Sequence, residues 1–135
     1  MKAIYTAEAV ASDEGRNGKA RTSDGKLTLD LSLPKELGGN GIGTNPEQLF
    51  AVGYAACFNS ALQMVAREQK TDVSGSAVGA RVTIGQHDDG GFGLAVELEV
   101  VLPNVDEATA HDLAQRAHAV GPNSNAPRGN NAVDI

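Results

Sequence analysis

The chain has 135 residues, 41% of them hydrophobic and 21% charged, which is the size and composition of one globular domain over residues 1–135. A formal net charge of −6 argues against a nucleic-acid partner, because phosphate recognition depends on clustered Lys and Arg. The sequence opens without a signal-peptide pattern, and its apolar runs look too short for a membrane span, so we expect a cytoplasmic protein with no membrane partner.

The first third of the chain has the pattern of strands. Residues 3–11 and 19–23 are rich in strand-forming residues, and residues 27–33 alternate leucine with polar side chains. The sequence Ser23-Asp24-Gly25 is typical of a hairpin turn. We therefore expect three strands before the first helix.

A long helix is predicted from Pro46 to about Gln69. Asn45 is a favoured N-cap and proline fits the first helical position. Residues 49–65 are apolar on nearly every side, which indicates a buried helix. Such a helix would be ~36 Å long, so we expect it to pack against a second subunit as well.

The second half of the chain repeats the order of strands followed by a helix. Residues 78–84 and 92–100 alternate as strands around a turn at 88–91, and residues 107–120 have the pattern of an amphipathic helix. Residues 130–135 are predicted to form a short last strand. The order of elements predicts an α+β fold.

Two segments carry a specific pattern, TNPEQLFA at 44–51 and GYAACF at 53–58. They resemble the organic hydroperoxide resistance proteins of the OsmC/Ohr family. Shorter matches extend the resemblance over almost the whole chain, at residues 15–18, 23–25, 36–39, 85–86, 90–94 and 124–126. The resemblance implies an intertwined homodimer of α+β subunits, with strands around a long buried central helix and active sites at the subunit interface.

The resemblance also implies a catalytic site. Cys57 matches the peroxidatic cysteine, Arg16 the arginine that stabilises its thiolate, and Glu47 the glutamate that holds this arginine. Without the resemblance, a cysteine on an apolar helix is more often an inert core residue. Arg16 would then be a solvated loop residue, and Glu47 a first-turn acid favoured by the helix dipole.

The implied activity is a thiol-dependent peroxidase that reduces organic hydroperoxides to alcohols through the thiolate and sulfenic acid of Cys57. An external thiol or dithiol, for example a lipoyl-type dithiol, would return the cysteine to its reduced form. The alternative is a non-catalytic member that binds an apolar ligand or senses oxidants. We expect no cofactor and no metal, since His87, His111 and His118 are too scattered for a closed metal site.

The sequence departs from the family after the last predicted helix. The family has a second, resolving cysteine in the element VCPYSN, and this chain reads VGPNSN at 120–125. Gly121 therefore occupies the resolving position, and Asn123 replaces the tyrosine. We expect a peroxidase of the one-cysteine type, or one with reduced activity because the resolving cysteine is absent.

Helix geometry limits how the implied site can form. Glu47 and Cys57 are ten residues apart on one predicted helix, which separates them by ~15 Å along its axis. A glutamate side chain cannot span that distance. Either the helix breaks between the two residues, or antiparallel helices of a dimer bring each glutamate towards the opposite cysteine.

Overall fold

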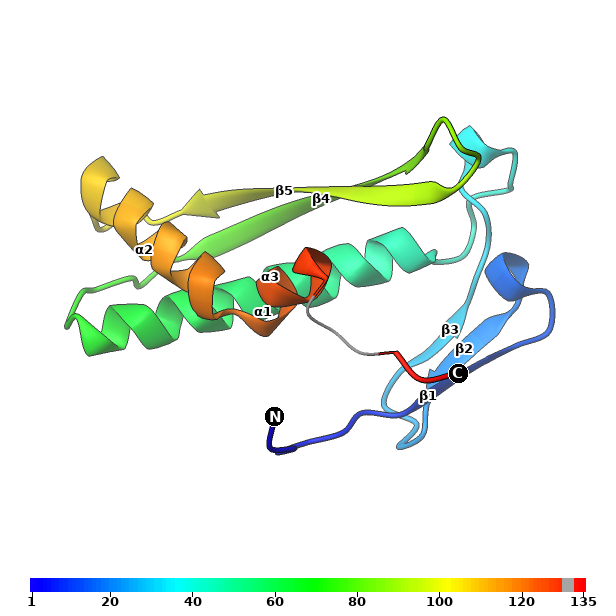
Figure 1. The fold of residues 1–135 in the computed structure, drawn as a ribbon, viewed down its shortest axis with the longest axis horizontal. Helices are drawn as coiled ribbons and strands as arrows, with labels where there is room; N and C mark the ends of the chain where they lie inside the picture. The colour runs from blue at the N-terminus through cyan, green and yellow to red at the C-terminus, as the bar shows by residue number, and fades with distance from the viewer. Residues whose placement is uncertain (130–132) are drawn as a thin grey trace. The chain divides into compact units, whose positions relative to one another are not determined.

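The computed structural model describes residues 1–129 and 133–135. The chain divides into two compact units, Met1–Leu49 and Phe50–Ile135, and each is described by itself. Helix α1 (Pro46–Glu68) begins in the first unit and continues into the second. Both units are drawn in Figure 1. That residues 1–135 form one domain remains a prediction.

The first unit contains a three-stranded antiparallel sheet in the order β1-β2-β3 (Figure 1). Its strands are β1 (Ala9–Ser12), β2 (Lys19–Thr22) and β3 (Thr28–Asp30). The three predicted strands are present, but the outer two are shorter than expected. The predicted strand at 3–11 is wrong over its first half, since residues 3–8 are exposed and lie outside the sheet among the described residues.

A hydrogen-bonded connection fixes the segment that leads into α1. The backbone N–H of Thr44 donates to the carbonyl of Asp30, and the N–H of Ser32 donates to the carbonyl of Thr44, both at 3.0 Å. Leu33 donates its N–H to Oδ1 of Asn17, in the short 3-10 turn Gly15–Asn17. The loop of this turn and the start of α1 are therefore held to the same end of β3.

Helix α1 begins as its sequence predicts. Oδ1 of Asn45 accepts a hydrogen bond from the backbone N–H of Gln48 at 2.9 Å, which is the N-cap interaction. The helix then runs without interruption to Glu68, so its predicted length is confirmed.

The prediction that α1 is buried on every side is wrong for a single chain. Its buried residues lie on one side of the helix: Tyr54, Phe58, Ala61, Leu62, Val65 and Ala66. Val52 is 70% exposed and Met64 is 44% exposed. The side of α1 away from the core, which carries Val52, Ala56 and Met64, is therefore left open in the isolated subunit, and we call it the apolar strip.

By length and composition alone, α1 could cross a membrane, with a mean hydropathy of 1.4 over its most apolar window. This corrects the expectation that every apolar run is too short for a span. The observation is weak evidence of a membrane helix, because core helices of globular proteins share these properties, and one third of the window is already buried.

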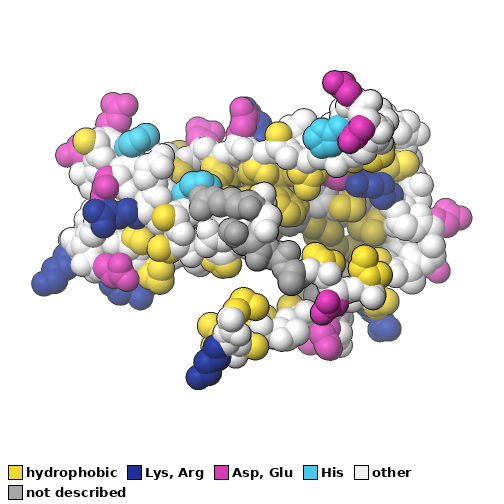
Figure 2. Space-filling view, in the orientation of Figure 1, with side chains coloured by type: hydrophobic (Ala, Val, Ile, Leu, Met, Phe, Trp, Pro, Cys, Tyr) yellow, Lys and Arg dark blue, Asp and Glu magenta, His cyan; other side chains and the backbone are white. Residues whose placement is uncertain are grey.

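The second unit pairs the rest of α1 with a long hairpin. Strands β4 (Ala77–Gln86) and β5 (Phe92–Val101) are antiparallel, with Ala77 opposite Val101 and Gln86 opposite Phe92. Both strands are longer than predicted. Side chains of Val78, Val96, Leu98 and Val100 pack on the core, and hydrophobic side chains are visible along this side of the hairpin (Figure 2).

Helix α2 (Glu107–Val120) follows the hairpin and has the predicted bounds. Its N-cap is Asp106, whose Oδ1 accepts a hydrogen bond from the N–H of Thr109 at 2.7 Å. Leu113 and Ala117 of α2 are fully buried against the core that contains Leu62 of α1.

The end of the chain differs from the prediction. A short helix, α3 (Pro122–Asn125), and a 3-10 turn, Ala126–Arg128, follow α2 directly, and neither was expected. Residues 133–135 have no regular secondary structure, and the remainder of the predicted strand at 130–135 lies outside the described residues. The mixed helix and sheet architecture agrees with the predicted α+β class.

Candidate functional site

Cys57 is a half-buried residue near the middle of α1. It shares one face of the helix with Tyr54, three residues before it, and Ala61, four residues after it, and Phe58 is its next neighbour along the chain. These three neighbours are buried, and Cys57 is more exposed than any of them. The thiol therefore lies at the border of the core rather than within it.

The segment after α2 packs on this face of α1. The hydroxyl of Tyr54 donates a hydrogen bond of 2.8 Å to Oγ of Ser124, and both side chains are almost completely buried. Figure 1 shows α3 beside the middle of α1. The connection joins residues 70 positions apart in the sequence.

Gly121, the expected resolving position, is buried at the junction of α2 and α3. A Cβ atom added there would lie 3.8 Å from Cβ of Ala61 and 3.6 Å from Oγ of Ser124. Ala61 is one helical turn after Cys57 and on the same face. Position 121 is therefore next to the turn of α1 that carries the thiol.

The backbone at Gly121 does not require glycine. Its φ is −69° and its ψ is 129°, an extended conformation that any residue adopts. An added Cβ would lie 3.0 Å from the carbonyl oxygen of Ala117, which demands only a small local shift. A cysteine could thus occupy this position without a left-handed backbone.

Arg16 and Glu47 form a two-pronged ion pair in the first unit. Nη1 of Arg16 donates to Oε2 of Glu47 at 2.8 Å, and Nη2 donates to Oε1 at 2.7 Å. The side chain of Glu47 is 14% exposed and that of Arg16 is 38% exposed. Such parallel hydrogen bonds hold the guanidinium plane in one orientation.

The pair shifts the pKa of both groups. Hydrogen bonding from Arg16 lowers the pKa of the Glu47 carboxyl below its ordinary value, although partial burial opposes this. The hydrogen bond to Glu47 likewise raises the pKa of Arg16. Both groups therefore stay charged at neutral pH.

The structure brings together two of the three predicted catalytic residues. Arg16 and Glu47 belong to the first unit, and Cys57 belongs to the second. The possibility of a helix break between Glu47 and Cys57 is wrong, because α1 is continuous through both. Of the two arrangements that the helix geometry allowed, only the dimeric one remains open.

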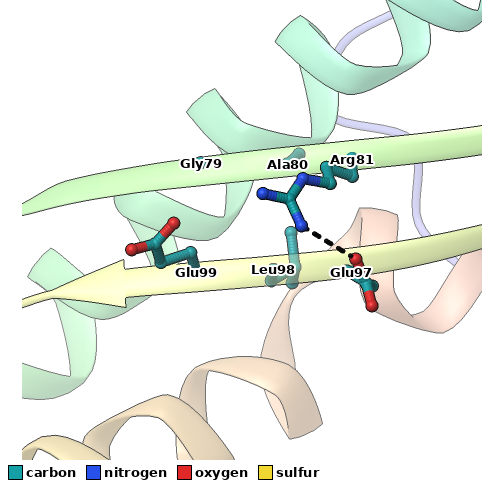
Figure 3. Close-up of a pocket in the computed structure, with 6 residues that line it drawn as sticks. All are labelled: Gly79, Ala80, Arg81, Glu97, Leu98 and Glu99. Atoms are coloured by element: carbon teal, nitrogen blue, oxygen red, sulfur yellow. Dashed lines mark hydrogen bonds and ion pairs between the residues drawn. The ribbon is translucent and has the colours of Figure 1, made fainter.

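Other places in the molecule offer less chemistry. Among the described residues, no group of three His, Cys, Asp or Glu side chains is close enough to hold a metal ion. A depression of about 640 Å³ lies on the hairpin, lined by Gly79, Ala80, Arg81, Glu97, Leu98 and Glu99. Figure 3 shows Arg81 reaching across the strands to Glu97, at 3.4 Å, while Glu99 points away. This depression contains no nucleophile.

The contact between Tyr54 and Ser124 is the feature that sequence reasoning missed. Each residue lies in a segment that matches the family, at 53–58 and at 124–126. A buried tyrosine also needs a partner for its hydroxyl, which was a usable signal. The sequence could not show that the partner would be Ser124.

Comparisons with known proteins give a consistent result. Residues 38–135 match the family described as OsmC-like protein. The organic hydroperoxide resistance protein of Xanthomonas axonopodis pv. citri is 50% identical, covering 99% of this chain and 93% of its own length. The protein OhrB of Bacillus subtilis, also called an organic hydroperoxide resistance protein, is 41% identical over 98% of this chain and 96% of its own.

Solved structures agree with the sequence comparisons. The crystal structure of an organic hydroperoxide resistance protein from Legionella pneumophila matches with a TM-score of 0.90 and 47% identity. The match covers 96% of this chain and 93% of that one. The fold described above is therefore the fold of these proteins.

Proposed function

Since this chain belongs to the OsmC-like family and its named relatives are organic hydroperoxide resistance proteins, we propose that it is a thiol-dependent peroxidase that reduces organic hydroperoxides to alcohols. The observation that supports this most is the double hydrogen bond between Arg16 and Glu47. It keeps a guanidinium oriented and charged, which suits a group that must stabilise a thiolate.

In the proposed reaction the Cys57 thiolate attacks the terminal oxygen of the hydroperoxide, ROOH. The O–O bond breaks, a bond forms between sulfur and oxygen, and the alkoxide takes up a proton and leaves as the alcohol, ROH. The sulfur is oxidised to sulfenic acid and the peroxide is reduced. Arg16 would hold the sulfur in its anionic form, and Glu47 would position Arg16.

The proposal includes a homodimer. The exposed apolar strip of α1, which contains Val52 and Met64, is the kind of surface that a second subunit covers. Because α1 is continuous, the ~15 Å rise between Glu47 and Cys57 keeps them apart within one helix. We assign Arg16 and Glu47 of one subunit to the Cys57 of its partner.

Regeneration of the thiol must then use an external reductant. Gly121 occupies the position next to the Cys57 turn where the family has its second cysteine, so an internal disulfide cannot form. A monothiol or a lipoyl-type dithiol would reduce the sulfenic acid in two steps through a mixed disulfide. We place this cycle in the cytoplasm, where thiols are kept reduced.

A peroxidase assay tests the proposal. Consumption of cumene or tert-butyl hydroperoxide should be measured with glutathione and with dihydrolipoamide, for the parent chain and for Cys57→Ser. We expect turnover with at least one thiol and none for Cys57→Ser. If the parent chain shows no turnover with glutathione and none with dihydrolipoamide, a peroxidase function is contradicted.

The presence of glycine at position 121, where the family has its second cysteine, also supports a second candidate function. In this reading the protein is a non-catalytic family member that senses oxidants. Such a protein would accumulate oxidised Cys57 because it lacks the internal partner. Slow reduction of the sulfenic acid by all supplied thiols, together with rapid oxidation by peroxide, would favour this second function.

A further inference from the structure

The turn of α1 that carries Cys57 lies between two places where the segment after α2 approaches the helix. On its N-terminal side the Tyr54 hydroxyl donates to Oγ of Ser124 at 2.8 Å. On its C-terminal side Gly121 lies close to Ala61, since a Cβ placed at position 121 would be 3.8 Å from Cβ of Ala61. Cys57 falls between these two contacts, on the same helix face.

The residues that approach α1 at these two places belong to one short segment. Gly121 and Ser124 are three residues apart, and Oγ of Ser124 is 3.6 Å from a Cβ placed at position 121. The N–H of Asn125 donates to the carbonyl of Gly121 at 3.1 Å, which makes residues 121–125 one compact turn. We name residues 121–125 the closing segment.

The closing segment is attached to α1 through a buried polar contact. Its polar anchor is the buried hydrogen bond of Ser124, and Tyr54 is itself held in place by an edge contact with Phe50, with ring centres 6.0 Å apart. A buried hydroxyl pair of this kind is lost as a unit, because removal of one oxygen leaves the other without its partner. The side chain of Ser124 therefore contributes to holding the segment beside the turn that carries the thiol.

We propose that the hydrogen bond between Tyr54 and Ser124 is a positioning contact that holds the closing segment beside Cys57 and limits the size of the reagent that reaches the sulfur. This inference rests on the proposed function for its biological meaning: reduction of the sulfenic acid requires an incoming thiol, RSH. In that step the S–O bond breaks, an S–S bond forms, and the hydroxyl leaves as water with the thiol proton. Small or extended thiols would pass the closing segment more easily than bulky ones.

The experiment uses reagents that attack the reduced Cys57 and need no peroxide, so it stands even if the protein is not a peroxidase. Rates of reaction should be measured with methyl methanethiosulfonate, which is small, and with 2,2′-dithiodipyridine, which is a bulky neutral disulfide. The proteins are the parent chain, Tyr54→Phe, Ser124→Ala and the double variant. Tyr54→Phe removes only one oxygen, so the test relies on this variant if Ser124→Ala fails to fold.

We expect each single variant to raise the rate with the bulky reagent by about fivefold, the change that one neutral hydrogen bond typically contributes. The rate with the small reagent should change far less, and the double variant should resemble the single ones because both remove the same contact. Tyr5→Phe is a matched control, since Tyr5 is 82% exposed.

Val65→Ala provides a second control, because it destabilises the same helix at a buried position outside the contact. It should leave the ratio of the two rates unchanged. A ratio that is unchanged in Tyr54→Phe, or one that shifts equally in Val65→Ala, would overturn the proposal. Absence of peroxidase activity in the parent chain, together with the expected change in ratio in the variants, would instead count against the proposed function alone.

Discussion

The guanidinium of Arg16 and the carboxylate of Glu47 meet through two parallel hydrogen bonds, of 2.8 and 2.7 Å, between residues 31 positions apart in the sequence. The arginine is on a short turn after β1, and the glutamate is in the first turn of α1. An acid is favoured at a helix N-terminus without any partner. The paired geometry goes beyond that preference, because it also fixes the direction of the arginine.

The first prediction concerns Arg16 and the thiolate. Arg16→Ala should slow alkylation of Cys57 by iodoacetamide near neutral pH, because an ordinary thiol is mostly protonated there and its anion would lose a cationic neighbour. Arg16→Lys should recover only part of the rate, since an ammonium cannot form both hydrogen bonds with Glu47.

The chain offers a matched control for this prediction. Arg81 pairs with Glu97 at 3.4 Å on the exposed face of the hairpin. Arg81→Ala removes the same charge and should leave the alkylation rate unchanged. Equal pH–rate profiles for Arg16→Ala and the parent chain would show that Arg16 does not act on the sulfur.

The second prediction concerns acid. The pKa of Glu47 is lowered in the folded chain, so its pair stabilises the fold above the ordinary carboxyl pKa, and this contribution is lost as pH falls through the lowered pKa. The raised pKa of Arg16 keeps that partner charged throughout. Urea unfolding should show Glu47→Gln less stable than the parent by at most about 1 kcal/mol at pH 7, because the arginine is partly exposed.

This difference between Glu47→Gln and the parent chain should shrink as the pH falls below the ordinary carboxyl pKa of about 4.3, and it should vanish only below the lowered pKa of Glu47. Glu97→Gln, on the exposed pair of the hairpin, is the control and should show a smaller difference at every pH. If the difference in unfolding free energy between Glu47→Gln and the parent chain grows as the pH falls, its sign contradicts stabilisation by the ion pair of Glu47 with Arg16.

The sequence was most informative where local chemistry determines structure. The N-cap at Asn45 and the alternation of β4 and β5 depend on neighbouring residues, so both were predictable. Residues 3–8 were expected in a strand because they have strand composition, but strand formation also needs a partner that composition does not reveal. The short helix α3 was missed because four residues carry little periodicity.

The candidate site was only partly predictable for a related reason. The pairing of Arg16 with Glu47 came from the family resemblance, since nothing local links a loop arginine to a helix 31 residues later. The contact of Tyr54 with Ser124 spans 70 residues and depends on how α2 packs on α1. Contacts of this kind are decided by tertiary packing rather than by local pattern.

The third prediction concerns the apolar strip of α1. Val52→Glu places a charge on a residue that is 70% exposed in the single chain, so it should not disturb the subunit core. If the strip is a dimer interface, the charge should dissociate the dimer in sedimentation velocity at micromolar concentration. Thr83→Glu adds the same charge on the exposed face of β4 and should leave the dimer intact.

The parent chain must itself sediment as a dimer for this comparison. A parent chain that is monomeric at that concentration would contradict the homodimer. A dimeric Val52→Glu would contradict the assignment of the interface to the strip.

The fourth prediction concerns the missing thiol. Gly121→Cys should form a disulfide with Cys57 after one equivalent of hydroperoxide, because position 121 lies beside the turn that carries Cys57 and its φ of −69° suits cysteine. The variant should then resist overoxidation and gain turnover with a dithiol. Gly121→Ser is the control, since it adds similar bulk without a thiol.

Intact-protein mass spectrometry distinguishes the outcomes for Gly121→Cys. Loss of two hydrogens means a disulfide formed, and gain of one oxygen means that it did not. Gain of oxygen alone, as in Gly121→Ser, would show that position 121 is not the resolving position.

The most direct test of the central claim is a single-turnover reaction without any thiol. Reduced protein is mixed with one equivalent of cumene hydroperoxide, and the alcohol and the state of Cys57 are both measured. The account predicts one cumyl alcohol per Cys57, a sulfenic acid that dimedone traps, and neither product for Cys57→Ser. Unmodified Cys57, or the same yield of alcohol from Cys57→Ser, would contradict it.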